Sequence, residues 1–294
     1  MGFKGIYANK SSAAKIGIFF LLIFVSVITH LFFFYALIYL FTDNGLGLIQ
    51  LPQDLSSQET VNYLKLMQLF SGIGLFITPT LLYAYLTNFD FKFAKLSRQN
   101  TILVIAIMLL ITPFVGLLLE WNMMIPAPEW LTQFDVHSEA IVEAFLQMGT
   151  IWDLFYTILV IAVVPAIGEE LLFRGYLQKK IGNWLRNPHT AILITAFLFS
   201  AIHFHFQGMI PRFVLGVLLG YLFYWSNSLW LPILAHFVNN AQAVIFSYPL
   251  FKVDSGAYSL LSETKIDPMM ALFSLVSAAL LLYVLHKNIS IKKG

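Results

Sequence analysis

Two adjacent carboxylates stand at the end of one of the most apolar stretches of the chain. Glu169 and Glu170 follow the run IWDLFYTILVIAVVPAI after a single glycine, and Arg174 lies four residues after Glu170. An ionised carboxylate at membrane depth is costly unless it faces a polar cavity or a partner, so it is a functional candidate by default. A Glu170–Arg174 ion pair would explain those two residues structurally. It does not explain Glu169, which projects about 100° away around the helix.

Two further pairs of side chains lie downstream, each inside an apolar run. Phe199 and His203 are four residues apart, and so are His236 and Asn240. Each pair therefore shares one face of a helix. A single histidine in a membrane helix is usually a packed side chain with one hydrogen-bond partner. Polar groups in three separate helices favour a common site instead.

The spacing of these groups allows them to meet. A turn at NWLRNPHT, where Pro188 would break the helix, puts Glu169 and His203 at the same depth on antiparallel helices. Residues 171–186 must then continue the fourth apolar helix beside the fifth. We expect a long helix that is amphipathic in its second half, with Arg174 turned inward to Glu170. Pro165 is expected to bend this helix.

The chain has far more apolar surface than one soluble core needs, since 59% of its 294 residues are hydrophobic and only 11% are charged. The apolar residues form blocks long enough to cross about 30 Å of hydrocarbon as helices. The eight blocks are residues 16–42, 63–87, 101–120, 150–169, 189–206, 210–226, 230–249 and 267–286. The sequence thus predicts an all-α fold, a polytopic membrane helix bundle of about eight transmembrane helices.

Basic and acidic residues alternate between successive connections. The basic ones are Lys4, Lys10, Lys15, Lys92, Lys95, Arg98, Arg174, Lys179, Lys180, Arg186, Lys287, Lys292 and Lys293. Segments 43–63 and 121–150 carry only acidic charges, at Asp43, Asp54, Glu59, Glu129, Asp135, Glu139 and Glu143. The positive-inside rule therefore predicts that both the N and the C terminus are cytoplasmic. The first block is too long for the apolar region of a signal peptide and is expected to be a span.

No internal repeat or long soluble loop interrupts the chain, which predicts a single integral membrane domain over 1–294 with a motif-bearing core at about 150–250. Segment 121–150 is expected to contain a short interfacial helix, with Ile141, Phe145 and Met148 on one face. An exterior loop is the alternative. The net charge of +2 gives no support for a nucleic-acid partner, and the absence of cysteine excludes thiolate chemistry.

The motif residues occur in an order that resembles the signatures of a known family. They are EELLFR with Glu169, Glu170 and Arg174, FSAIH with Phe199 and His203, and HFVNN with His236 and Asn240. These are similar to the EExxxR, FxxxH and HxxxN motifs of the CPBP intramembrane proteases, also called Abi. That family includes type II CAAX prenyl endopeptidases and bacterial bacteriocin-processing or immunity proteins. The resemblance covers roughly residues 165–241.

The resemblance implies roles for these residues. Glu169 and His203 would bind a water molecule and take its proton, while His236 and Asn240 would donate hydrogen bonds to the oxyanion. Glu170 and Arg174 of the first motif would hold these catalytic side chains in their orientation, and Phe199 would support them. The same side chains could instead hold zinc through Glu169, His203 and His236. No HExxH motif is present, and a metal-free site also accounts for Asn240, so no cofactor is favoured and zinc remains the alternative.

The predicted function is therefore an endopeptidase of the bacterial plasma membrane that acts on membrane-associated peptides or protein tails within the lipid bilayer. Two other classes stay open. A non-catalytic membrane factor, such as a bacteriocin-immunity protein, would keep its function without Glu169. A proton-coupled transporter would also place Glu, His and Asn inside spans, but it predicts two related halves with broken helices, which the sequence does not show.

Overall fold

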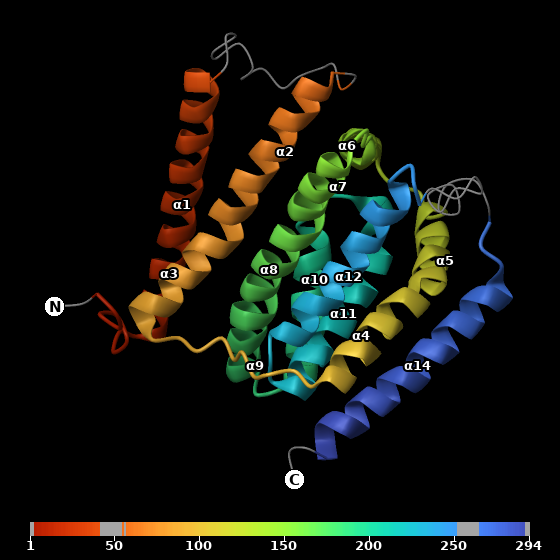
Figure 1. Ribbon diagram of the computed structural model, residues 1–294. Helices are drawn as coiled ribbons and strands as arrows, with labels where there is room; N and C mark the ends of the chain where they lie inside the picture. The colour runs from red at the N-terminus through yellow and green to blue at the C-terminus, as the bar shows by residue number, and fades with distance from the viewer. Residues whose placement is uncertain (1–2, 42–54, 56, 252–264, 292–294) are drawn as a thin grey trace.

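The computed structural model describes residues 3–41, 55, 57–251 and 265–291, and these residues form helices and connections without a strand. The predicted all-α fold is confirmed. The first half contains α1 (Ser12–Phe41), the continuous helix α2–η2–α3 (Gln58–Gly72, Ile73–Ile77, Thr78–Thr87), α4 (Arg98–Leu110), α5 (Thr112–Met123) and α6 (Glu129–Leu146). Figure 1 shows these helices from red to green along the chain.

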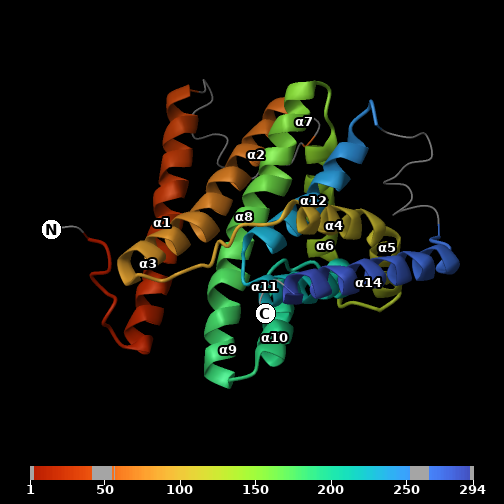
Figure 2. The same ribbon diagram turned by 60° about the horizontal axis from the view of Figure 1, so that its bottom comes forward.

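The second half begins with one helix of 35 residues, Ile151–Leu185. Its parts are α7 (Ile151–Thr157), η3 (Ile158–Val163), α8 (Val164–Glu170), η4 (Leu171–Gln178) and α9 (Lys179–Leu185). The chain then forms α10 (Pro188–Ala201), the short η5 (Phe206–Gly208), α11 (Met209–Ser226), α12 (Trp230–Ser247) and α14 (Pro268–Ile291). The predicted long fourth helix is thus confirmed, and Figure 2 shows α7, α8 and α9 following one line.

All eight apolar blocks lie mainly in helices, but the count of eight spans is not confirmed. Five helices in the described part of the chain are long and apolar enough to cross a membrane, or six if α4 and α5 form one span with a bend of 40°. Pro113 at the start of α5 accounts for the bend because it cannot donate a helical hydrogen bond. Helix α10 has only 14 residues, and α12 is made less apolar by several polar side chains in its second half.

Charge separates the two ends of the bundle. The start of α1, the α3–α4 connection, α9 and the end of α14 carry the described lysines other than Lys65 and Lys265, and they lie towards the lower end of Figure 1. The acidic helix α6 and the starts of α2 and α7 lie at the opposite end. Asp43, Asp54, Lys292 and Lys293 fall outside the described residues. The arrangement agrees with the predicted alternation of charge, while the cytoplasmic position of both termini stays a prediction.

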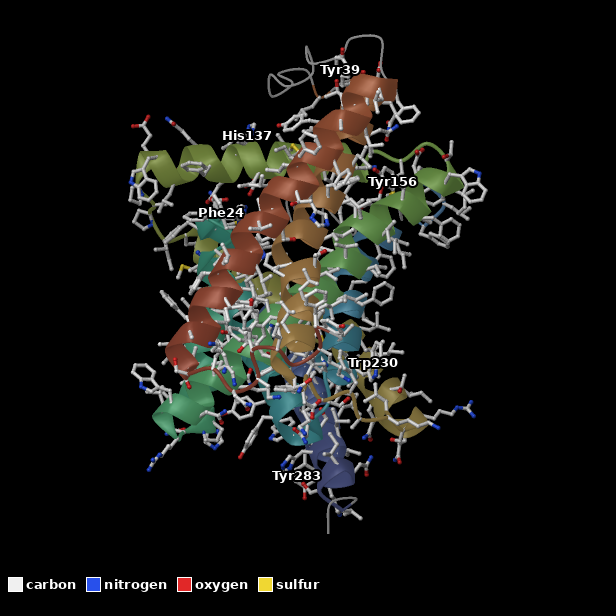
Figure 3. All side chains as sticks on the ribbon, turned by 90° about the vertical axis from the view of Figure 1, so that its left-hand side faces the viewer. Phe24, Tyr39, His137, Tyr156, Trp230 and Tyr283 are labelled. Carbon is white, nitrogen blue, oxygen red and sulfur yellow. The ribbon has the colours of Figure 1, made fainter. Side chains whose placement is uncertain are left out.

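The interior is built by helices that are far apart in the sequence. Helix α14 packs against α4 and α5, and α10 packs along α11. Two glycines permit the close approaches that the site needs. A Cβ at Gly168 would lie 2.7 Å from Phe76 Cβ in η2, and a Cβ at Gly216 would lie 3.1 Å from Ala196 Cα in α10. Helix α1 exposes many apolar side chains, including Phe24, which Figure 3 labels.

Helix α6 crosses the acidic end of the long helices, and Figure 3 shows it with His137. The predicted helix in segment 121–150 is confirmed, whereas its interfacial position stays a prediction. Met148 was wrongly assigned to this helix, which ends at Leu146. Phe145 packs in a cluster with Val61 of α2, while Met148 packs with α7 and α12 residues. The chain must turn before Thr150, which caps α7, and this turn separates the two side chains.

Candidate active site

The first motif forms a buried ion pair at the centre of the bundle. Arg174 Nη1 lies 2.6 Å from Glu170 Oε1, and both side chains are fully buried. Arg174 Nη2 also donates a hydrogen bond of 3.1 Å to the carbonyl of Gly216 in α11. The predicted inward turn of Arg174 is therefore confirmed. The pair also fixes a third group, because Glu170 Oε1 accepts a hydrogen bond of 2.9 Å from His236 Nδ1.

Glu169 is placed differently from its neighbour. It lines a cavity, whereas Glu170 lies behind the cavity wall. None of the described side chains donates a hydrogen bond to Glu169, and Oε2 is buried without such a partner. Its nearest polar contact is His236 Nε2, 3.9 Å from Oε2. Thus the ion pair accounts for Glu170 and leaves Glu169 free to act on a bound molecule.

Phe199 brings the three motifs together. It is 4% exposed, and its ring packs edge-on against His203 and His236 at centroid distances of 5.3 and 5.8 Å. Arg174 lies over the Phe199 ring at 4.5 Å, in the range of a cation–π contact. One aromatic side chain of α10 therefore sets the spacing between residues from η4, the turn after α10 and α12.

His203 and Glu169 line the same cavity, although no hydrogen bond links them in the described structure. The prediction that His203 shares a helix face with Phe199 is wrong, because α10 ends at Ala201 and His203 lies in the turn that follows. Pro188 is the first residue of α10, and the Asn187 side chain caps that helix. His203 Nδ1 donates a hydrogen bond of 2.8 Å to the Phe199 carbonyl. Because a carbonyl only accepts, the neutral His203 ring keeps Nε2 as an acceptor, which is the form a base requires.

Asn240 has a local role that follows from Pro165. Proline has no N–H, so Pro165 cannot donate the usual helical hydrogen bond to the carbonyl of Ile161. Asn240 Nδ2 donates a hydrogen bond of 3.0 Å to that carbonyl. The π-helical segment η3 directly precedes α8, so Pro165 is accommodated within a continuous helix. Asn240 nevertheless remains in the cavity wall, beside Asn239.

The cavity has a volume of about 610 Å³ and a polar and an apolar part. The polar side chains come from five helices and the connection after α10. They are Gln68, Ser138, Glu169, His203, Arg212, His236, Asn239 and Asn240. The rest of the wall is apolar, and α6 contributes Ile141, Val142 and Phe145. The cavity can therefore hold an apolar chain beside a cluster of groups suited to acid–base chemistry.

Sequence reasoning missed Arg212, Gln68 and Ser138, because they lie outside the three motifs, and Asn239, because it occupies an unspecified position within the third. A usable signal was present for Arg212. It is the only charged residue between Met209 and Ser226, the bounds of α11, and a lone charge in an apolar membrane helix is a functional candidate.

Comparison with known proteins agrees with this geometry. A family model described as type II CAAX prenyl endopeptidase Rce1-like matches residues 151–242. The predicted family is confirmed for this segment. The matched CAAX-type family is one of proteases, and its segment contains all the motif residues. The family model does not match the chain outside residues 151–242.

Two relatives come from Bacillus subtilis (strain 168), and both are uncharacterized. YpbD is 36% identical over 88 residues, which cover 29% of this chain and 42% of YpbD. YyaK is 28% identical over 178 residues, which cover 56% of this chain and 59% of YyaK. The matches thus span less than two thirds of either relative. No solved structure matches the chain.

A zinc site is the alternative that the CAAX-type family leaves open. Glu169, His203 and His236 line one cavity, but no group of three His, Asp or Glu side chains among the described residues is arranged to hold a metal ion. Glu170 accepts a hydrogen bond from His236, and Glu169 lies opposite the other ring nitrogen. The bond from His236 Nδ1 to Glu170 would leave Nε2 able to bind a metal, so what does not fit zinc is the spacing of the three side chains, which are not gathered around one ion position.

Proposed function

We propose that the protein is a membrane-embedded endopeptidase that hydrolyses membrane-associated peptides or protein tails through a water activated by Glu169 and His203. The observation that carries the proposal is the pairing of two glutamates with different environments in a cavity. Glu170 is held by Arg174 and His236, whereas Glu169 faces the cavity without a hydrogen bond from the described residues. With these two environments, Glu170 can hold neighbouring side chains in place while Glu169 takes part in the reaction.

The reaction follows from these placements. Glu169, assisted by His203, takes a proton from water as the water oxygen forms a bond to the peptide carbonyl carbon. The C=O π electrons move to the carbonyl oxygen and give a tetrahedral oxyanion. When the oxyanion collapses, the C–N bond breaks and the proton held at Glu169 passes to the leaving nitrogen. The products are a carboxylic acid and an amine.

The apolar wall and the apolar helices favour substrates that reside in the bilayer, and the Bacillus subtilis relatives favour a bacterial plasma membrane as its location. No nucleic-acid partner and no cofactor are part of the proposal. A mass-spectrometric comparison of membrane peptides from cells with the wild-type protein and with Glu169→Gln tests it. We expect peptides that accumulate uncut with the variant. Identical peptide sets, with a cellular phenotype that persists in the variant, would favour the non-catalytic membrane factor.

Metal dependence gives a separate prediction. Purified protein should hydrolyse its peptide at far less than stoichiometric zinc, and chelators should change the rate little, because Glu169 and His203 polarise the water directly. The measurements are metal content by mass spectrometry and rate with and without a chelator. Zinc at about one per chain in an active preparation, lost together with activity in His203→Ala, would contradict the metal-free mechanism.

A further inference from the structure

The two predicted oxyanion donors are partly committed elsewhere. His236 Nδ1 donates to Glu170, so this N–H is not available to an oxyanion. Asn240 Nδ2 already donates to the carbonyl of Ile161. A tetrahedral oxyanion in a site of low dielectric needs strong, fixed donors. The cavity therefore calls for a further positive or hydrogen-bonding group.

Arg212 is a cation in the wall of this cavity, together with Glu169 and His203. It makes no salt bridge with any carboxylate in the described residues. Its charge interacts at longer range with Asp135 and Glu169. Neither carboxylate forms a direct ion pair with Arg212, so part of the guanidinium stays available to a negative charge that forms in the cavity during the reaction.

The guanidinium is held in place by the connection between α10 and α11. Arg212 Nη1 donates a hydrogen bond of 3.2 Å to the carbonyl of His205, and Nη2 contacts His205 Nδ1. Gly208 N–H also donates to Nδ1, at 3.0 Å. The Nδ1 atom is therefore an acceptor, and Nε2 carries the proton and donates to Glu139 of α6 at 3.1 Å.

The same connection is anchored by a second residue of α6. The carboxylate of Asp135 accepts hydrogen bonds from the backbone N–H groups of Phe206 and Gln207, at 2.8 and 3.0 Å. Arg212 thus has a fixed orientation before substrate binds, and its guanidinium has more N–H donors than the contacts with His205 use. A fixed donor loses no energy to reorganisation when the oxyanion forms.

We propose that Arg212 is a further catalytic residue, which stabilises the oxyanion of the tetrahedral intermediate by charge and hydrogen bonding. The proposal rests on the proposed peptidase function. Arg212 transfers no proton, and the proton taken from water stays on the path through Glu169. His205 and Glu139 are positioning residues that orient the guanidinium.

The test uses a peptide identified in the membrane comparison and its phosphinate analogue, whose tetrahedral anion replaces the scissile amide. Arg212→Gln should lower kcat by about 10²–10³ and change KM much less. Arg212→Lys, which keeps the charge but loses the fork of donors, should fall between Arg212→Gln and wild type. Affinity for the phosphinate should fall by the same factor as kcat/KM, while affinity for the uncleaved peptide, measured in the Glu169→Gln background, should hold.

Two other variants keep the test clear. Arg186→Gln removes an arginine at the turn between α9 and α10, away from the cavity, and should leave kcat unchanged. In Gly208→Ala the new Cβ would overlap with Arg212 Nη2 and crowd His205 Nδ1, so the guanidinium should be displaced from its place beside His205 and kcat should fall while the melting temperature changes little. This variant reproduces the loss without changing the charge.

Three outcomes decide the proposal. Wild-type turnover in Arg212→Gln would overturn it. Equal losses of affinity for peptide and phosphinate would also overturn it, because Arg212 would then bind an anionic group of the substrate or maintain the fold. Absence of hydrolysis by the wild-type protein would remove the proposed function and this inference together, whereas hydrolysis at the wild-type rate in Arg212→Gln would remove the inference alone.

Discussion

Glu169→Gln should lower the rate of peptide hydrolysis by about 10²–10⁴, the range that positioned general bases supply. The amide keeps the volume of the carboxylate but cannot take a proton from water. Folding should be preserved, because no described side chain donates a hydrogen bond to Glu169 and its nearest polar contact is His236 Nε2 at 3.9 Å. The rate is measured with purified protein in detergent or vesicles, and folding by the thermal unfolding midpoint.

Glu143→Gln provides the matched control. Glu143 is exposed on α6 and does not line the cavity, so the same chemical change should leave the rate unchanged. A well-folded Glu169→Gln protein with wild-type turnover would exclude Glu169 as the base. The result would then favour another mechanism of hydrolysis at the same cavity.

The sequence predicts the helical frame because composition alone demands it. Apolar blocks near the length of a span can satisfy their backbone in a membrane only as helices. That Glu169 and His203 come close enough to line one cavity also follows from helix rise, since Pro188 marks where the next helix starts. The number of spans does not follow, because α10 is short and α12 carries the polar residues of the site. Helix length and hydropathy therefore do not identify a span where polar side chains of the site take the place of apolar ones.

The three motifs predict which residues meet but not how each one is held. That His236 contacts both glutamates depends on the register between α8 and α12, which no periodicity encodes. The bond from Asn240 to Ile161 depends on a carbonyl that Pro165 leaves free, and it shows only when both helices are in place. Arg212 has no partner at helical spacing, so its link to His205 and α6 arises from a connection whose conformation is set by tertiary contacts.

Arg174→Met should destabilise the protein by about 3–5 kcal/mol, because it leaves the Glu170 carboxylate buried without its cation. The methionine replaces much of the volume but loses the bonds to Glu170 and to the Gly216 carbonyl. It also removes the charge over Phe199. The thermal unfolding midpoint of the purified protein in detergent should therefore fall sharply, and activity should fall because the same carboxylate orients His236.

The double variant Glu170→Gln with Arg174→Met separates charge from packing. Replacing both members of a buried ion pair is often close to neutral for stability, whereas removing one strands the other. The double variant should therefore unfold at a higher temperature than Arg174→Met alone, and the difference measures the coupling between the two side chains. Its activity should remain low, because the introduced amide would hold His236 through a weaker, uncharged bond. If both variants unfold at the same temperature, Arg174 acts mainly through its packing against Phe199 and α11, and the ion pair contributes little to the fold.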